Sequence, residues 1–182
     1  MPLTKIQSLG ITDGTIVNAD INASAAIAGT KLTGAGKVLQ VVSTAKTDTF
    51  TTTSFAFTDL TGMSVSITPS SASNKVLILV SINASSNGDG SFLLFRNATS
   101  ITGDGASSRT ASTFGTGGRE DFEQYANSFQ YLDSPNTTSA ITYKMQCRSA
   151  GNTLHINREF TDGDNQASYR VISTITVMEI AA

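Results

Sequence analysis

Apolar residues recur from Val38 onward in the short runs that are typical of β-strands. Residues 63–67 alternate between apolar and hydroxyl side chains until Pro69, which cannot donate to a strand ladder. Residues 141–147 place Ile, Tyr, Met and Cys on one face and polar side chains on the other, as in a strand with one buried side. We therefore expect strands over residues 38–44, 63–67, 75–82, 92–95, 128–133, 141–147, 154–156 and 169–180.

Two of these runs are apolar on both faces. Residues 75–82 (Lys-Val-Leu-Ile-Leu-Val-Ser-Ile) predict a central strand between two packed layers, and residues 38–42 form a shorter run of the buried type. The sequence Asn87-Gly88-Asp89-Gly90 is typical of a hairpin turn and predicts that the strands on either side of it pair. The glycine- and hydroxyl-rich residues 101–118 predict a long surface loop.

Eight or nine short strands, separated by Gly and Asn turns and with little helical periodicity, predict an all-β protein. The expected architecture is an antiparallel β-sandwich of the jelly-roll type, a knob domain over residues 36–182.

The first 35 residues follow a different pattern. From Ile11 to Leu32, a large apolar residue occurs every five or six positions, a spacing that fits neither an amphipathic helix nor a strand. This spacing buries too little surface to offset the entropy of ordering the segment alone. Residues 1–35 are therefore expected to form an extended stem or attachment arm, which is either disordered or ordered by neighbouring copies wound round a common axis.

Composition and charge narrow the classes of function. Ser and Thr make up 49 of the 182 residues, whereas charged residues make up 14%. The net charge of −2 provides no field to attract nucleic acid, so we expect no nucleic-acid partner. No apolar run approaches the roughly 20 residues of a membrane-spanning helix, so we also expect no membrane insertion.

The chain offers few reagents for catalysis. Cys147 and His155 are its only cysteine and histidine, and the strand pattern predicts a buried structural thiol and a histidine at the surface or at an interface between subunits. The segments 103–105 and 162–165 contain the oxygen ligands that calcium prefers, but Asp-Gly pairs are more typical of turns. The charged segment 119–123 is more typical of a solvated loop than of a catalytic pair of carboxylates. We therefore expect no enzymatic activity, no metal site and no cofactor.

Aromatic residues gather after the long loop, at Phe122, Tyr125, Phe129 and Tyr131. Aromatic rings can stack on the apolar faces of sugars, but they can equally belong to the core, which is the interpretation we favour.

Two segments resemble proteins of tailed bacteriophages. Residues 11–32 (Ile-Thr-Asp-Gly-Thr-Ile-Val-Asn-Ala-Asp-Ile-Asn-Ala-Ser-Ala-Ala-Ile-Ala-Gly-Thr-Lys-Leu) resemble the stem or attachment segment of fibre and virion surface proteins, particularly from marine and cyanobacterial phages. Residues 173–180 (Ser-Thr-Ile-Thr-Val-Met-Glu-Ile) resemble the closing strand of the knob domains in such proteins. Together they cover about a sixth of the chain, and only the first motif is fairly specific.

The resemblance implies a homotrimeric structural protein on the surface of the phage particle, in contact with other capsid or tail proteins. Because this chain has one stem segment and one knob, it is more similar to a short fibre, spike or capsid decoration (cement) protein than to a long tail fibre. The alternative is an adhesin that recognises a glycan on the host surface, with Arg119, Tyr125 and Tyr131 as candidate receptor-facing residues. The residues expected to anchor and trimerise the arm are Leu3, Ile6, Leu9, Ile11, Ile16, Ile21, Ile27 and Leu32.

Overall fold

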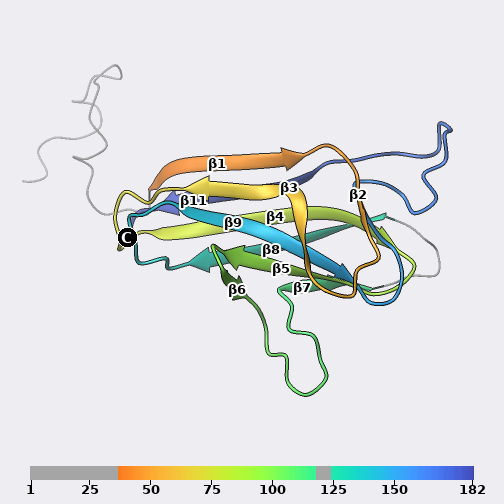
Figure 1. Ribbon diagram of the computed structural model, residues 1–182. Coiled ribbons are helices and arrows are strands. Elements are labelled where there is room, and N and C mark those ends of the chain that lie inside the picture. Colours follow the sequence, from red (N-terminus) through yellow and green to blue (C-terminus); the bar gives the residue numbers. More distant parts are fainter. Residues whose placement is uncertain (1–36, 118–123) are drawn as a thin grey trace, which may run out of the picture. The chain divides into compact units, whose positions relative to one another are not determined.

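The alternating pattern folds into strands throughout the part of the chain that the structure describes. The structure is a computed structural model, and it describes residues 37–117 and 124–182. Gly36–Ala182 form one compact unit. The strands are β1 (Val38–Lys46), β2 (Phe50–Thr52), β3 (Thr58–Ile67), β4 (Lys75–Ser86), β5 (Gly90–Arg96), β6 (Thr99–Ile101), β7 (Phe114–Thr116), β8 (Gln124–Asp133), β9 (Ile141–Ser149), β10 (Leu154–Ile156) and β11 (Ser173–Ile180) (Figure 1).

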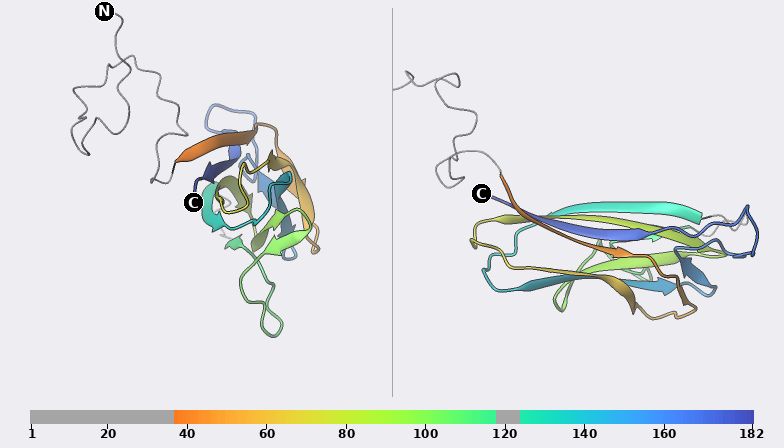
Figure 2. Two further views of the ribbon diagram at one scale, coloured as in Figure 1. Left: turned by 90° about the vertical axis from the view of Figure 1, so that its left-hand side faces the viewer. Right: turned by 90° about the horizontal axis from the view of Figure 1, so that it is seen from above.

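The strands form two antiparallel sheets that face each other. Sheet A has the order β1-β11-β4-β8, and β10 and β2 extend it beside one end of β4. Sheet B has the order β3-β9-β5, and β6 and β7 both pair with the free edge of β5. Successive long strands along the chain belong alternately to the two sheets, as in a jelly roll. Seen end-on, both sheets curl around the space between them (Figure 2). The predicted all-β, antiparallel sandwich is therefore confirmed.

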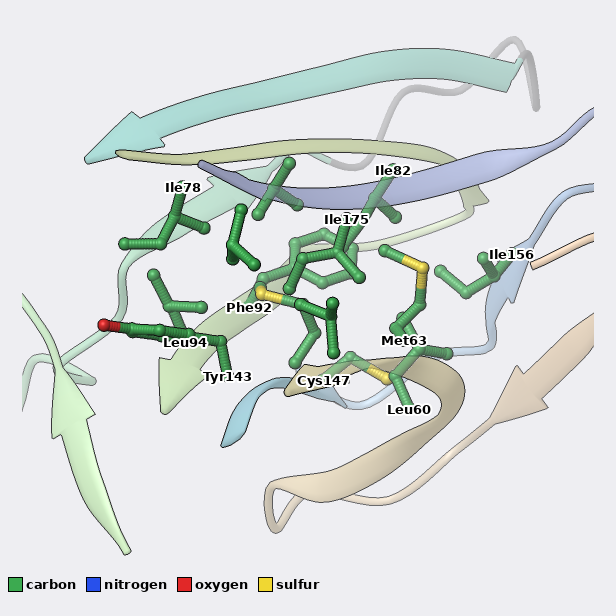
Figure 3. Close-up of a cluster of buried hydrophobic side chains, with 14 of the residues drawn as sticks. Leu60, Met63, Ile78, Ile82, Phe92, Leu94, Tyr143, Cys147, Ile156 and Ile175 are labelled. Carbon is green, nitrogen blue, oxygen red and sulfur yellow. The ribbon is translucent and has the colours of Figure 1, made fainter. Parts of the chain in front are cut away.

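The core fills the space between the sheets because every long strand turns one side inward (Figure 3). Sheet A contributes Ile78, Ile82 and Ile175, and sheet B contributes Phe92 and Tyr143, all of them fully buried. The predicted inward face of residues 141–147 is confirmed, including the buried thiol of Cys147.

The predicted hairpin at residues 87–90 is wrong. The strand before this turn, β4, belongs to sheet A, and the strand after it, β5, belongs to sheet B. Both edges of β4 are already paired, with β11 and β10 on one side and β8 on the other. The turn instead packs on residues 149–153, where Asn87 Oδ1 accepts from the amide of Thr153 and Asp89 O from that of Ala150. The local turn signal was correct, but the pairing depends on contacts far away in the sequence.

Three predicted boundaries also change. The expected strand 169–180 begins only at Ser173, and the strand expected from Ser128 begins four residues earlier, at Gln124. The expected loop 101–118 contains β7 and the end of β6, and the loop between them projects from the sandwich (Figure 1).

The runs that are apolar on both faces are covered on one face only. In β4, Ile78 and Val80 are fully or almost fully buried, whereas Leu77 and Leu79 on the other side are only partly buried. In β1, Val38 and Val41 are more than half exposed, at 53% and 55%. The strands were predicted correctly, but the second packed layer that we expected is not supplied by the described part of this chain.

The two ends of the sandwich differ in their connections. At one end the chain enters β1 and finishes after β11, where the amide of Ala181 donates to the carbonyl of Lys37 at 2.9 Å. At the opposite end lies the long connection of residues 157–172 (Figure 1). We call these the entry end and the far end.

Candidate functional surfaces

The residues predicted to anchor the protein fall outside the part that the structure describes, so their role stays a prediction. They are Leu3, Ile6, Leu9, Ile11, Ile16, Ile21, Ile27 and Leu32. Among the candidate receptor-facing residues, Arg119 also lies outside the described residues, as does Phe122.

The other two candidate receptor-facing residues, Tyr125 and Tyr131, both lie on β8. They are six residues apart on the same side of the strand, a separation of about 20 Å, so one small ligand cannot contact both rings. Phe129, between them, stacks at 5.8 Å from Phe114, which stacks in turn at 4.9 Å on the buried Phe92. The aromatic cluster thus continues from the core outward, and Tyr131, 38% exposed and 6.4 Å from Phe129, is its outermost ring.

Cys147 and His155 are both buried and held by contacts within the fold. Burial raises the pKa of the Cys147 thiol to about 12, so the thiol stays protonated at neutral pH. His155 was expected at the surface or at an interface between subunits, but it is only 7% exposed within the single chain. Its Nδ1 is hydrogen-bonded to the hydroxyl of Thr51 at 2.9 Å, and the ring meets Phe160 edge-on at 5.0 Å. Burial and the nearby Arg158 lower the pKa of His155, which favours the neutral ring. The strand pattern could not show that residues 157–160 fold over this face.

An ion pair between the buried carboxylate of Asp133 and the partly exposed Arg96 joins the two sheets at the entry end. Asp133, at the end of β8, accepts from Arg96 Nη1 on β5 at 2.9 and 3.0 Å. The hydroxyl of Tyr143 on β9 donates to the same carboxylate at 2.7 Å, and the amide of Ser134 donates at 2.9 Å. Burial and the hydrogen bond to Asp133 raise the pKa of Tyr143, so the phenol stays protonated. Both carboxylate oxygens are fully engaged in linking the sheets.

A second buried carboxylate, Glu179 on β11, is held by neutral donors. Gln40 Nε2 donates to it at 2.6 Å, Asn74 Nδ2 at 2.6 Å, and the amide and hydroxyl of Ser70 at 2.6 and 2.8 Å. Burial by itself raises the pKa of Glu179, but these hydrogen bonds outweigh it and lower the pKa to about 2. Nothing in the residue pattern distinguished Asp133 or Glu179 from surface acids, because their partners come from other strands and loops.

The far end carries a polar hollow of about 350 Å³ between residues 162 and 170. Asp162 lines it and is paired with Arg170 at 2.8 Å and with Arg158 at 3.6 Å. The hydrogen bond from Arg170 lowers the pKa of Asp162 and keeps it ionised. The ring of Tyr169, 51% exposed, also borders the hollow. The positive charge beside Asp162 comes from the protein itself, and no group of three or more metal-binding side chains occurs in residues 37–117 and 124–182.

The outer face of sheet A is apolar and nearly free of charge. The strand registers place Val41, Met178, Leu77 and Leu132 in one row that crosses β1, β11, β4 and β8. Val41 and Leu132 are each 55% exposed. The structure describes all four of these strands, and Lys75 is the one charged residue among their outward positions. Its Nζ donates to the hydroxyl of Ser134 at 2.8 Å. We call the row and its apolar neighbours the apolar band, formed by Val38, Leu39, Val41, Leu77, Leu79, Leu132, Met178 and Ile180.

The outer face of sheet B has the opposite character. Lys144 Nζ on β9 pairs with Asp59 on β3 at 2.9 Å and lies 5.8 Å from the centre of the Phe95 ring. Arg148 lies over two rings, 4.8 Å from the centre of Phe55 and 5.8 Å from that of Phe57. The charges and rings of this face are therefore paired within the chain.

No family model and no curated protein matches the chain. Within the described ranges, no helix has the length and apolar character needed to cross a membrane.

Proposed function

We propose that this chain is a non-enzymatic structural protein of a bacteriophage particle. It is a homotrimeric short fibre, spike or capsid decoration protein, attached to the capsid or tail by residues 1–35 with its β-sandwich on the virion surface. The phage origin comes from the resemblance of residues 11–32 and 173–180 to virion proteins.

The observation that carries the proposal is the apolar band on the outer face of sheet A, which has Lys75 as its one charged outward residue. Contiguous exposed apolar patches often mark contact sites between proteins, and a subunit of an assembly buries them. The jelly-roll fold agrees with the proposal, because virion proteins use it, but lectins and many other proteins share it, so the fold alone assigns no function.

The arrangement of the two ends fits attachment through the N-terminal arm. β1 starts at the entry end, so residues 1–36 join the sandwich at the end opposite to the long connection of residues 157–172 (Figure 1). The buried reactive groups agree with a structural role, since Cys147, Asp133 and Glu179 all have stabilising surroundings.

The test of attachment is a double substitution, Ile16→Asp with Ile21→Asp, in the full chain. We expect the circular dichroism of the sandwich to be unchanged and binding to particles that lack the protein to be lost in co-sedimentation. Asn18→Asp with Asn22→Asp adds the same charge at polar positions of the same segment, and we expect it to bind like the native chain. Binding by the isoleucine variant would contradict anchoring by the arm.

The second candidate function is recognition of a host glycan, and the hollow beside Tyr169 favours it. An exposed ring next to carboxylate and guanidinium groups provides both the stacking surface and the hydrogen-bond partners that a sugar needs. Binding on a glycan array that Tyr169→Ala abolishes, and that Phe55→Ala in the connection between β2 and β3 leaves intact, supports this function. The separate candidates Tyr125 and Tyr131 are tested by Tyr125→Ala and Tyr131→Ala on the same array.

A further inference from the structure

We propose that the outer face of sheet A packs against a second copy of this chain, and that the apolar band forms the contact between subunits. The inference rests on the proposed homotrimer and assigns its interface to one face. Around a threefold axis, three such faces turned inward bury their apolar bands together.

The first argument is the mismatch between sequence pattern and burial. Strands with apolar residues on both faces normally lie between two layers. Residues 75–82 follow this pattern, yet Leu77 and Leu79 face outward with no layer of the described chain over them. Met178 and Ile180 in β11 and Val41 in β1 also face outward with no layer of the described chain over them. A second copy supplies the missing layer.

The second argument is charge. A face that packs against itself or its symmetry mates brings like residues close together, so repeated charges would repel. The outward positions of β1, β11, β4 and β8 carry one charged group, Lys75, at the entry end of the sheet. Its Nζ is bonded to Ser134, beside the row that runs from Val41 to Leu132. The face is thus compatible with itself.

The third argument is size. Four strands about 4.8 Å apart and eight residues long, at about 3.3 Å per residue, present a face on the order of 500 Å². Two such faces bury about 1,000 Å², which is the lower limit expected of a specific interface. The arm of the same chain is a poorer occupant, because one large apolar residue every five or six positions covers a narrow line and not four strands.

The start of β1 agrees with this arrangement. Val38, its first residue, is itself part of the apolar band. Copies that pack through this face therefore bring the starts of their β1 strands to one interface.

The experiment compares two charge pairs in the full chain by light scattering. Val41→Lys with Leu132→Lys changes two half-exposed residues at opposite edges of the band, and Thr61→Lys with Ser64→Lys adds the same charge to exposed positions of β3 on sheet B. We expect the native protein and the sheet B variant to have about three times the protomer mass of 19.0 kDa, and the sheet A variant to have the protomer mass. Because Cys147 is the only cysteine and is fully buried, its failure to react with a thiol reagent confirms that each variant is folded.

A second pair of variants keeps the inference testable if the lysine variant unfolds. In the native background, Leu132→Cys should react with a thiol reagent at least tenfold more slowly than Thr61→Cys, although both positions are exposed in the protomer. Equal reaction rates would overturn the inference, as would an oligomer that survives Val41→Lys with Leu132→Lys, and in both cases a native trimer would still stand. A native monomer would overturn both the trimer and this interface. A Leu132→Cys thiol protected only after addition of virions would assign the face to a different virion protein.

Discussion

The outer faces of the two sheets differ although the same alternation of residues builds both. On sheet B, the outward side chains pair with each other: Lys144 meets Asp59 and Phe95, and Arg148 lies over Phe55 and Phe57. On sheet A, the outward side chains include one apolar row across four strands that nothing in the described chain covers, beside rows of mostly polar residues. The charged and aromatic side chains of sheet B contact each other, whereas the apolar band of sheet A has no such contacts within the described chain.

The difference shows that β-sandwich geometry fixes which residues face outward but not what the outward residues do. A jelly roll needs only its inner faces to be apolar. The apolar residues on the outside of sheet A therefore contribute little to folding the protomer, and we attribute them to assembly. Four substitutions test this contrast, from the largest expected effect to the smallest.

Asp133→Ala should have the largest effect because it removes the link between the sheets. The change leaves Arg96, which is 33% exposed, without its carboxylate and the buried Tyr143 hydroxyl without its acceptor; an unsatisfied buried group by itself costs about 1–3 kcal/mol, to which the lost ion pair adds. Urea denaturation measures this loss in free energy of unfolding. Asp59→Ala, which breaks an exposed pair on sheet B, should cost at most about 1 kcal/mol. Similar losses in the two variants would show that the sheets are not held together at Asp133.

Glu179→Gln should have an intermediate effect and change the pH dependence of stability. The pKa of Glu179 is lowered from 4.5 to about 2 in the folded protein, so the ionised group stabilises the fold above about pH 4.5. This contribution is lost as the pH falls from about 4.5 toward 2. At pH 7 the glutamine variant should lose about 1–3 kcal/mol, since an amide group replaces one accepting oxygen.

Thermal unfolding across this pH range compares the native protein with the glutamine variant. The difference between the two should shrink as the pH falls. A constant difference from pH 7 to pH 2 would show that Glu179 does not titrate in this window.

Arg148→Ala tests whether contacts within the chain stabilise the outer face of sheet B. The guanidinium lies over two rings, and its loss should cost about 1 kcal/mol of unfolding free energy, measured in urea. Arg148→Lys should recover part of this loss, because the charge is kept but the planar group is not. Neither variant should change the molar mass measured by light scattering. A change in oligomeric state would assign an interface to sheet B.

The smallest effect compares two matched hydroxyl pairs. Ser43 and Thr176 are hydrogen-bonded at 2.8 Å on the outer face of sheet A, and Ser66 and Thr142 are bonded at the same distance on sheet B. Ser43→Val and Ser66→Val should each change the unfolding free energy of the protomer by no more than about 0.5 kcal/mol. Ser43→Val alone should shift dissociation to lower protein concentration, because it extends the apolar band. Equal shifts in dilution experiments would contradict the contrast between the faces.

The pattern of the sequence was sufficient for most strands and for their inward faces. Residues 141–147 show why: alternation with a period of two is a local property, and one apolar side of a strand must be buried wherever the strand lies. The burial of Cys147 followed from its place on that side. The charge-poor, hydroxyl-rich composition was likewise a property of the sequence alone. The anchoring residues from Leu3 to Leu32 and the receptor-facing role of Arg119, Tyr125 and Tyr131 stay predictions.

Only the tertiary structure decided which strands pair and what covers each face. The turn at residues 87–90 is local, yet β4 pairs with β11, β10 and β8, and not with the strand that follows the turn. His155 is buried because residues 157–160 return over it, and Asp133 and Glu179 are buried because donors from distant segments surround them. The exposure of the apolar band was likewise decided by the tertiary structure. The sequence of a strand that is apolar on both faces predicts a packed layer on each side, but it does not show which chain supplies that layer.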